Sequence, residues 1–214
     1  MQTAVIVAGG RSTRFGTADK AVAELAGTPM IRRVADRIAG VVDAVVLNCR
    51  AEQVPAIQEA MEGYPRRVTT AVDPETDRGP MAGIMTGLRG VESLAGPETP
   101  AFVVACDMPF VDPEFVDYLF GRVEGYDAAV PRLDDRWFQT THAVYRAGPM
   151  ADACESALER NERKIIEPLF DLDYVVVEEA EALEYTTRAA FENLNTREEF
   201  EEAAERISDR DRKR

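Results

Sequence analysis

Short apolar segments rich in β-branched residues alternate with longer amphipathic segments through the first half of the chain. Four short segments predict strands, at residues 3–8, 43–48, 68–72 and 101–106. The longer segments predict helices at residues 29–39, 51–62, 80–95 and 112–124. This order predicts a parallel sheet covered by helices on both faces. The strands lack regular apolar–polar alternation, as expected when both faces of a sheet are buried.

The pattern becomes less regular after about residue 125. Further strands are predicted at residues 127–131, 142–146 and 173–178, and further helices at residues 147–160 and 162–170. No internal repeat or low-complexity linker interrupts the chain. We therefore expect a single α/β domain over residues 1–207, followed by a flexible tail at 208–214.

Local signals predict where two helices begin. Thr28 is expected to cap the helix at 29–39, with Pro29 in its first position and Gly40 after its end. A last helix is predicted to start at Thr196, because Thr196 and Glu199 have the spacing of a capping box.

Charge and composition exclude several classes of partner. The 214 residues carry a formal net charge of −14, which repels nucleic acid and anionic lipid, and no apolar stretch is long enough to span a bilayer. Cys49, Cys106 and Cys154 form no C-x-x-C pair, and residues 1–10 show no secretion signal. We expect a cytoplasmic protein that binds neither nucleic acid nor membranes. Lysines are a small minority among the basic residues, and the acidic surface would suit solubility in high salt.

The segment after the first strand has features of a phosphate-binding loop. Residues 8–10 (AGG) stand where the carboxyl end of a parallel strand meets its ligand, and Arg11, Arg14 and Lys20 follow. Glycines let a backbone approach a ligand closely, and basic side chains offset phosphate charge. The spacing matches neither G-x-G-x-x-G nor a Walker A loop. The alternative is an ordinary strand-to-helix turn with solvated basic residues.

The same segment resembles a known signature. "AGGRSTRFGTADK" (8–20) is similar to the A-G-G-x-x-x-R-[MF]-G-…-K signature of nucleotidyltransferases that act on nucleoside triphosphates. The rest of the chain resembles the molybdenum cofactor guanylyltransferases within that superfamily. The matching segments are "GTPMI" (27–31), "VVLN" (45–48), "VDPETDRGPMAGI" (72–84), "ACDMPF" (105–110) and "FENLNTREEF" (191–200). They occur in order and span nearly the whole chain.

The resemblance implies a fold and a reaction. The fold is a three-layer α/β/α Rossmann-like nucleotidyltransferase fold with a mostly parallel sheet, in which residues 1–110 bind the nucleotide and 111–207 the acceptor. The reaction transfers GMP from GTP to the phosphate of molybdopterin and releases pyrophosphate. Proteins that insert the molybdenum cofactor, and apo-molybdoenzymes, are the further partners it implies. A phosphate dianion is already nucleophilic at neutral pH, so no general base is expected.

The resemblance also assigns residues. Lys20, Asp107 and Arg14 are the expected catalytic residues, and Asp107 the expected ligand of Mg²⁺. The expected nucleotide-binding residues are Val7, Ala8, Gly9, Gly10, Lys20, Asn48, Asp73, Gly79, Asp107 and Asn195. A carboxylate at a strand end suits Mg²⁺, which prefers hard oxygen ligands, although acidic residues also cap helices there. Asn195 has the alternative role of helping to cap the last helix.

Other readings remain open from the sequence. An adenosylcobinamide-phosphate guanylyltransferase shares the loop and the "NLNT" ending, and a cytidylyltransferase could act on the same pterin. A nucleotide-binding regulator without catalysis is a third alternative, which Lys20 and Asp107 disfavour. His142 and Cys106 fit core positions better than catalytic ones. Trp137 could stack on a pterin or simply be exposed.

Overall fold

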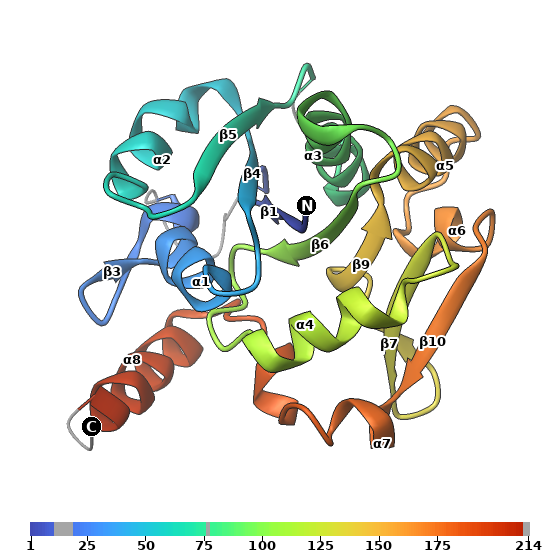
Figure 1. Ribbon diagram of the computed structural model, residues 1–214. Coiled ribbons are helices and arrows are strands. Elements are labelled where there is room, and N and C mark those ends of the chain that lie inside the picture. The colour runs from blue at the N-terminus through green and yellow to red at the C-terminus, as the bar shows by residue number, and fades with distance from the viewer. Residues whose placement is uncertain (11–18, 76–77, 212–214) are drawn as a thin grey trace.

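A computed structural model describes residues 1–10, 19–75 and 78–211. The main sheet has the strand order β10-β7-β9-β6-β1-β4-β5, with β8 paired to β7 (Figure 1). Its strands are β1 (Thr3–Val7), β4 (Ala44–Cys49), β5 (Arg67–Val72), β6 (Pro100–Ala105), β7 (Ala128–Leu133), β8 (Trp137–Phe138), β9 (His142–Arg146) and β10 (Tyr174–Glu178). A separate two-stranded sheet joins β2 (Glu24–Leu25) to β3 (Thr28–Pro29).

The sheet is mixed but mostly parallel, as the alternation of strands and helices predicts. Strand β1 pairs in parallel with both β4 and β6, β4 with β5, and β7 with β10. Strand β9 is the exception, because it lies antiparallel between β6 and β7. The short β8 is also antiparallel to β7. The carboxyl ends of β1, β4, β5 and β6 therefore lie at one edge.

Helices cover both faces of this sheet (Figure 1). The helices are α1 (Met30–Ile38), α2 (Val54–Ala60), α3 (Pro80–Ala95), α4 (Pro113–Arg122), α5 (Ala147–Glu159), α6 (Ile166–Leu169), α7 (Glu179–Ala182) and α8 (Arg197–Asp211). Three 3-10 turns, η1 (Lys20–Val22), η2 (Ala51–Gln53) and η3 (Arg188–Phe191), complete the described elements.

Two apolar cores hold these layers together. On one face, Ile6 and Leu47 of the sheet share a buried cluster with residues of α1, α2 and α4. On the other, Val5 and Val46 are buried with residues of α3 and α5. Successive residues of a strand point to opposite faces, so neighbouring apolar residues in β1 and β4 serve different cores. This explains why the buried strands read as continuous apolar runs.

Several predicted boundaries were wrong. Thr28 does not cap α1, because Thr28 and Pro29 pair with Leu25 and Glu24 as β3; Pro29 itself is the N-cap residue and Met30 the first helical one. The predicted helix at 51–62 divides into the 3-10 turn η2 and the shorter α2. The predicted strand ends differ from the observed ones by no more than two residues.

The C-terminal third differs more from prediction. Of the helix predicted at 162–170, only α6 forms, because the chain reverses at Asn161 (φ 62°) and the Glu162 N–H bonds back to the Ala157 carbonyl at 3.0 Å. The capping box is confirmed: Glu199 N–H donates to Thr196 Oγ1 at 3.2 Å, and Thr196 N–H to Glu199 Oε2 at 2.9 Å. Helix α8 continues to Asp211, and residues 212–214 of the expected tail lie outside the described residues.

His142 is a core residue in this fold. It is fully buried, with its ring packed against Phe102, Phe115 and Phe191. Neither ring nitrogen has a hydrogen-bond partner among the described residues. Burial lowers the pKa of His142 to about 3, because the charged imidazolium cannot be solvated there. The residue therefore contributes packing, and only in its neutral form.

The depressed pKa predicts a stability that depends on pH. The folded-state pKa lies below the unfolded value of about 6.5, so the unfolded chain binds more protons between the two values. The contribution of His142 is complete above about pH 6.5 and is lost as the pH falls towards 3. Between about pH 7 and pH 5, the wild-type chain should lose about 2 kcal/mol more free energy of unfolding than His142→Leu. Urea unfolding at both pH values and constant salt measures this. Because the chain has one histidine, equal losses in both proteins would contradict the expectation.

Candidate functional site

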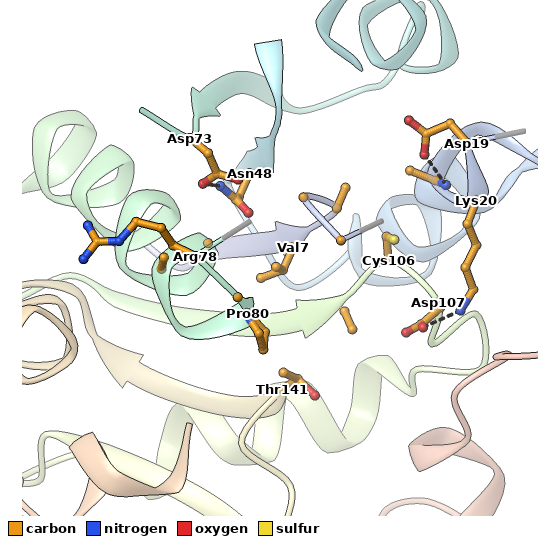
Figure 2. A pocket seen from close by; sticks show the side chains of 18 of the residues that line it. Val7, Asp19, Lys20, Asn48, Asp73, Arg78, Pro80, Cys106, Asp107 and Thr141 are labelled. Atoms are coloured by element: carbon orange, nitrogen blue, oxygen red, sulfur yellow. Dashed lines mark hydrogen bonds and ion pairs between the residues drawn. The ribbon is translucent and has the colours of Figure 1, made fainter. Parts of the chain in front are cut away.

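A cavity of about 620 Å³ opens at the edge where the parallel strands end (Figure 2). Its volume lies within the usual range for small-molecule sites. Every predicted site residue that the structure describes lines it: Val7, Ala8, Gly9, Gly10, Lys20, Asn48, Asp73, Gly79, Asp107 and Asn195. Arg14 lies outside the described residues. The cavity thus gathers residues that are separated by as much as 188 positions in the chain, from Val7 to Asn195.

Lys20 and Asp107 form the charged pair of the cavity. Lys20 is the first residue of η1. Asp19 caps η1, because its side chain accepts a 3.1 Å hydrogen bond from Ala21 N–H. Lys20 Nζ lies 2.6 Å from Asp107 Oδ2 and 3.5 Å from Asn195 Oδ1. Both members of the ion pair are largely buried, which strengthens their attraction relative to a solvated pair. Asp107 Oδ1 is buried without a hydrogen-bond partner among the described residues.

The second polar pair joins Asn48 at the end of β4 to Asp73 just after β5. Asn48 Nδ2 donates to Asp73 Oδ1 at 2.7 Å and to the Ala71 carbonyl at 3.3 Å. Asn48 Oδ1 is buried and has no hydrogen-bond partner within the described part of the chain. A buried amide oxygen that lacks a donor costs free energy unless a ligand or water supplies one. Asn48 therefore presents an acceptor at the cavity wall.

Two glycines give this pair its space. A Cβ atom on Gly9 would lie 2.6 Å from Asp73 Oδ2, and one on Gly83 would lie 2.5 Å from Asn48 Oδ1. Both distances are shorter than van der Waals contact, so a side chain at either position would displace the pair. Gly79 borders the same region as the N-cap residue of α3.

Known proteins are similar to this one along nearly the whole chain. The sequence model of the MobA-like NTP transferase domain matches residues 4–175. A probable molybdenum cofactor guanylyltransferase of Natronomonas pharaonis is 50% identical over 208 residues, covering 97% of this chain and 98% of its own. The chain belongs to the MobA-like NTP transferase family.

Other members of the family extend the comparison. A probable molybdenum cofactor guanylyltransferase of Methanosarcina mazei is 36% identical over 94% of this chain and 88% of its own. The crystal structure of molybdopterin-guanine dinucleotide biosynthesis protein A from Archaeoglobus fulgidus superposes with a TM-score of 0.76 at 28% identity. That comparison covers 98% of this chain and all of the other. The predicted mostly parallel nucleotidyltransferase fold and the family resemblance are thus confirmed.

MobA-like NTP transferases usually need a divalent metal ion. No group of three or more His, Cys, Asp or Glu side chains that could hold a metal occurs in the part of the chain that the structure describes. Asp107 nevertheless fits such an ion, because its buried Oδ1 is an unused hard-oxygen donor at the cavity. Mg²⁺ is commonly held by one or two carboxylates together with substrate phosphates and water. A single carboxylate is therefore a sufficient protein contribution.

Asn195 takes part in the cavity as well as in the start of α8. Its backbone N–H donates to Glu199 Oε2 at 2.6 Å, while its side-chain oxygen faces Lys20. Thr196 supplies the side-chain cap of the helix, which leaves the Asn195 amide for the site. The Asn195 side chain lines the cavity, and its role in binding stays a prediction.

Two further residues from the sequence analysis lie outside the cavity, and a third lines it without a reactive form. Trp137 is 62% exposed in β8 and does not line the cavity. His142 lies in the core, whereas its neighbour Thr141 reaches the cavity. Cys106 lines the cavity wall, but burial, reinforced by the negative charge of Asp107, raises the pKa of its thiol. The thiol stays protonated and is a poor nucleophile.

Sequence reasoning missed several cavity residues. Arg78 and Glu75 line the rim and form an ion pair of 3.6 Å, so Arg78 is a second basic side chain at the site. Both occur in the quoted segment 72–84, where a basic residue before a glycine-proline helix start was an available signal. Asp19, which caps η1, also lines the cavity.

No described helix is long and apolar enough to cross a membrane.

Proposed function

We propose that this protein transfers GMP from GTP to the phosphate of molybdopterin, the organic part of the molybdenum cofactor, yielding the guanine dinucleotide cofactor and pyrophosphate. The observation that carries the proposal is one cavity that combines three features: residues 8–10, called the glycine loop below, the Lys20–Asp107 pair and the Asn48–Asp73 pair. The relatives of Natronomonas pharaonis and Methanosarcina mazei are named probable molybdenum cofactor guanylyltransferases, which supports the choice of substrates.

The cavity residues form two groups, one suited to phosphate and one suited to a nucleobase. Backbone N–H groups of the glycine loop and the ammonium of Lys20 suit a triphosphate, which carries several negative charges. Asn48 Oδ1 and the Asp73 carboxylate are acceptors, and guanine presents N1–H and N2–H donors. We assign residues 1–110 to the nucleotide and 111–207 to the acceptor. Arg14 keeps its proposed catalytic role, although it is not among the described residues.

The same residues support a proposal for the identity of the metal ion. We propose Mg²⁺, held by Asp107 with the remaining ligands coming from phosphate oxygens and water. When bound, the ion supplies charge neutralisation at the phosphates. Lys20 would then share the Asp107 carboxylate, holding Oδ2 and leaving Oδ1 for the metal.

The reaction needs positioning more than acid–base chemistry. An oxygen of the acceptor's terminal phosphate forms a bond to the α-phosphorus of GTP, and the bond from that phosphorus to the bridging oxygen of pyrophosphate breaks. A phosphate monoester has a second pKa near 6, so the attacking group is largely a dianion at neutral pH. Lys20 and the loop N–H groups stabilise the charge that moves onto the leaving pyrophosphate. No side chain has to remove a proton.

Lys20→Ala is expected to weaken GTP use at least tenfold. A charge-assisted phosphate contact is lost, which corresponds to about 1.4 kcal/mol. Measuring kcat and KM for GTP, together with the melting temperature, separates this loss from a loss of fold. Lys164→Ala is a matched control, because Lys164 is exposed and does not line the cavity. Identical constants for the Lys20 variant and the wild type would remove Lys20 from the phosphate site.

The proposed function is tested by measuring pyrophosphate release from GTP with different acceptors. Pyrophosphate release from GTP should depend on added molybdopterin and should be absent with adenosylcobinamide phosphate. Release with cobinamide phosphate alone would assign the chain to the other guanylyltransferase. GTP binding without pyrophosphate release, whichever acceptor is added, would favour a nucleotide-binding regulator.

We further propose that the reaction takes place in the cytoplasm and that the product passes to cofactor-insertion proteins and apo-molybdoenzymes.

A further inference from the structure

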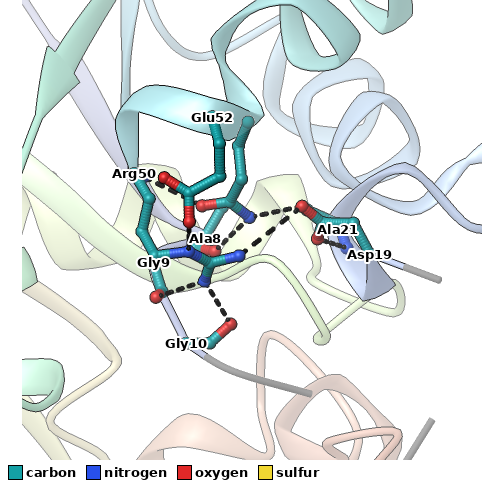
Figure 3. A network of polar contacts seen from close by, with 8 residues as sticks. Ala8, Gly9, Gly10, Asp19, Ala21, Arg50 and Glu52 are labelled. Atoms are coloured by element: carbon teal, nitrogen blue, oxygen red, sulfur yellow. Dashed lines mark hydrogen bonds and ion pairs between the residues drawn. The ribbon is translucent and has the colours of Figure 1, made fainter. Parts of the chain in front are cut away.

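Arg50 lies against Gly9 and Gly10 of the glycine loop (Figure 3) and does not line the cavity. Strand β4 runs alongside β1, with Asn48 opposite Val7, and Ala8 N–H continues the ladder to the Asn48 carbonyl at 2.9 Å. Arg50 is two residues beyond Asn48. Its side chain therefore starts beside the loop and lies along it.

The guanidinium group of Arg50 holds two successive carbonyls of the loop. Its Nη1 donates to the carbonyl oxygens of Gly9 at 2.7 Å and Gly10 at 2.9 Å. Gln53 extends the row, because its Nε2 donates to the Ala8 carbonyl at 3.0 Å. Three consecutive carbonyls thus point towards side chains from the β4–α2 connection.

This arrangement fixes where the loop N–H groups point. In a trans peptide the N–H is antiparallel to the carbonyl of the preceding residue, and the described part of the chain contains no cis peptide. Because the Ala8 and Gly9 carbonyls face Gln53 and Arg50, the N–H groups of Gly9 and Gly10 face the opposite side. Gly9 and Gly10 line the cavity, whereas Arg50 and Gln53 do not. The N–H groups are therefore directed to the cavity side.

The same side chains also hold the segment that carries Lys20. Asp19, which caps η1, accepts a 2.6 Å hydrogen bond from Gln53 Nε2 and lies 4.0 Å from Arg50 Nη2. Arg50 Nε is bound to Glu52 Oε1 at 2.7 Å, and Arg50 N–H to Gln53 Oε1 at 2.9 Å. The Arg50 side chain is 13% exposed, so this geometry is well protected from solvent. One cluster thereby positions both Gly9–Gly10 and the Asp19–Lys20 turn.

We infer that Arg50 is a positioning residue for phosphate binding, which acts through the backbone of Gly9 and Gly10 without touching the ligand. It fixes the carbonyls on one side, so that the loop N–H groups remain aligned for phosphate oxygens on the other. Its positive charge is offset by Glu52 and Asp19, so its effect comes from directed hydrogen bonds. Donation to a carbonyl also polarises the peptide group and strengthens its N–H as a donor. This inference rests on the proposed function, since it concerns the phosphates of the same nucleotide.

The test compares ligands with and without phosphates. Dissociation constants for GTP, inorganic tripolyphosphate and guanosine are measured by calorimetry for the wild-type chain, Arg50→Gln and Arg50→Lys. Arg50→Gln should weaken GTP and tripolyphosphate about tenfold and leave guanosine within about twofold. Arg50→Lys should fall between the two proteins, because an ammonium group keeps the charge but lacks the planar set of donors that spans both carbonyls and Asp19.

Arg146→Gln is the matched control. Arg146 also joins two backbone carbonyls, those of Tyr126 at 2.9 Å and Glu98 at 3.0 Å. Neither of these residues lines the cavity, whereas Gly9 and Gly10 do. The Arg146 variant should bind all three ligands like the wild type. If the Arg50 variants bound tripolyphosphate normally, or lost guanosine as strongly as GTP, the inference would be overturned. Wild-type chain that bound neither GTP nor tripolyphosphate would overturn it too, whereas phosphate binding without transfer would count against the proposed function alone.

Discussion

Asp107→Asn is expected to lower GTP-dependent pyrophosphate release at least about 100-fold, because the buried carboxylate is the expected metal donor and the partner of Lys20. The amide keeps the shape of the side chain but loses the charge that binds both the metal and the ammonium group. The remaining rate should no longer rise with Mg²⁺ concentration over the range that saturates the wild type. Steady-state kinetics over a Mg²⁺ series measures both effects.

Asp112→Asn controls for the loss of a nearby carboxylate. Asp112 caps α4 by accepting a 3.1 Å hydrogen bond from Glu114 N–H, and it does not line the cavity. Asparagine is also a good capping residue, so this variant should retain normal kinetics. Near-normal turnover and Mg²⁺ dependence in the Asp107 variant would show that another residue holds the metal.

The chain is expected to use GTP about 100-fold better than CTP or ATP. In the proposed binding mode, Asn48 Oδ1 and the Asp73 carboxylate accept from guanine N1–H and N2–H. Cytosine and adenine carry only an exocyclic amino donor on the corresponding edge, so either base would leave at least one acceptor without its partner. Unpaired buried polar groups cost about 1–3 kcal/mol each, which accounts for a factor of this size. The ratio of kcat/KM values with saturating molybdopterin measures the discrimination.

Two variants locate the source of this discrimination. Asn48→Asp keeps the size of the side chain but replaces the Nδ2 donor with a second carboxylate oxygen beside Asp73. Repulsion between the two carboxylates should displace both acceptors and reduce the preference for GTP. Asn161→Asp makes the same change at an exposed position outside the cavity and should leave it intact. Equal use of GTP and CTP by the wild-type chain would instead point to a cytidylyltransferase, with the phosphate loop still in place.

The parallel half of the fold was predictable because its signals are local. Runs such as residues 43–48 and 101–106 are apolar on both faces, and intervening helices make the sheet parallel. The C-terminal third of the fold was less predictable from the sequence. Nothing within residues 142–146 indicates that β9 inserts antiparallel between β6 and β7, since that order depends on contacts between distant strands. The two-residue pairing that places Thr28 and Pro29 in β3 is similarly too short to leave a pattern.

The cavity residues were predictable where they follow strands or glycines, as Asn48, Asp73 and Asp107 do. Their pairing was not, because the Lys20–Asp107 bond joins residues 87 positions apart and depends on how η1 turns towards β6. Arg50 was missed since it lies against the loop and does not line the cavity. A long basic side chain two residues after the strand-end Asn48, followed by Gln53, was the available signal.

The fate of a label on the α-phosphorus of GTP tests the central claim most directly. After incubation with the purified chain, Mg²⁺ and molybdopterin, the α-label should appear in a pterin product that carries one added guanylyl group, and a γ-label should appear in pyrophosphate. Recovery of the α-label as free GMP or unchanged GTP, with no labelled pterin, would contradict the assignment as a molybdenum cofactor guanylyltransferase.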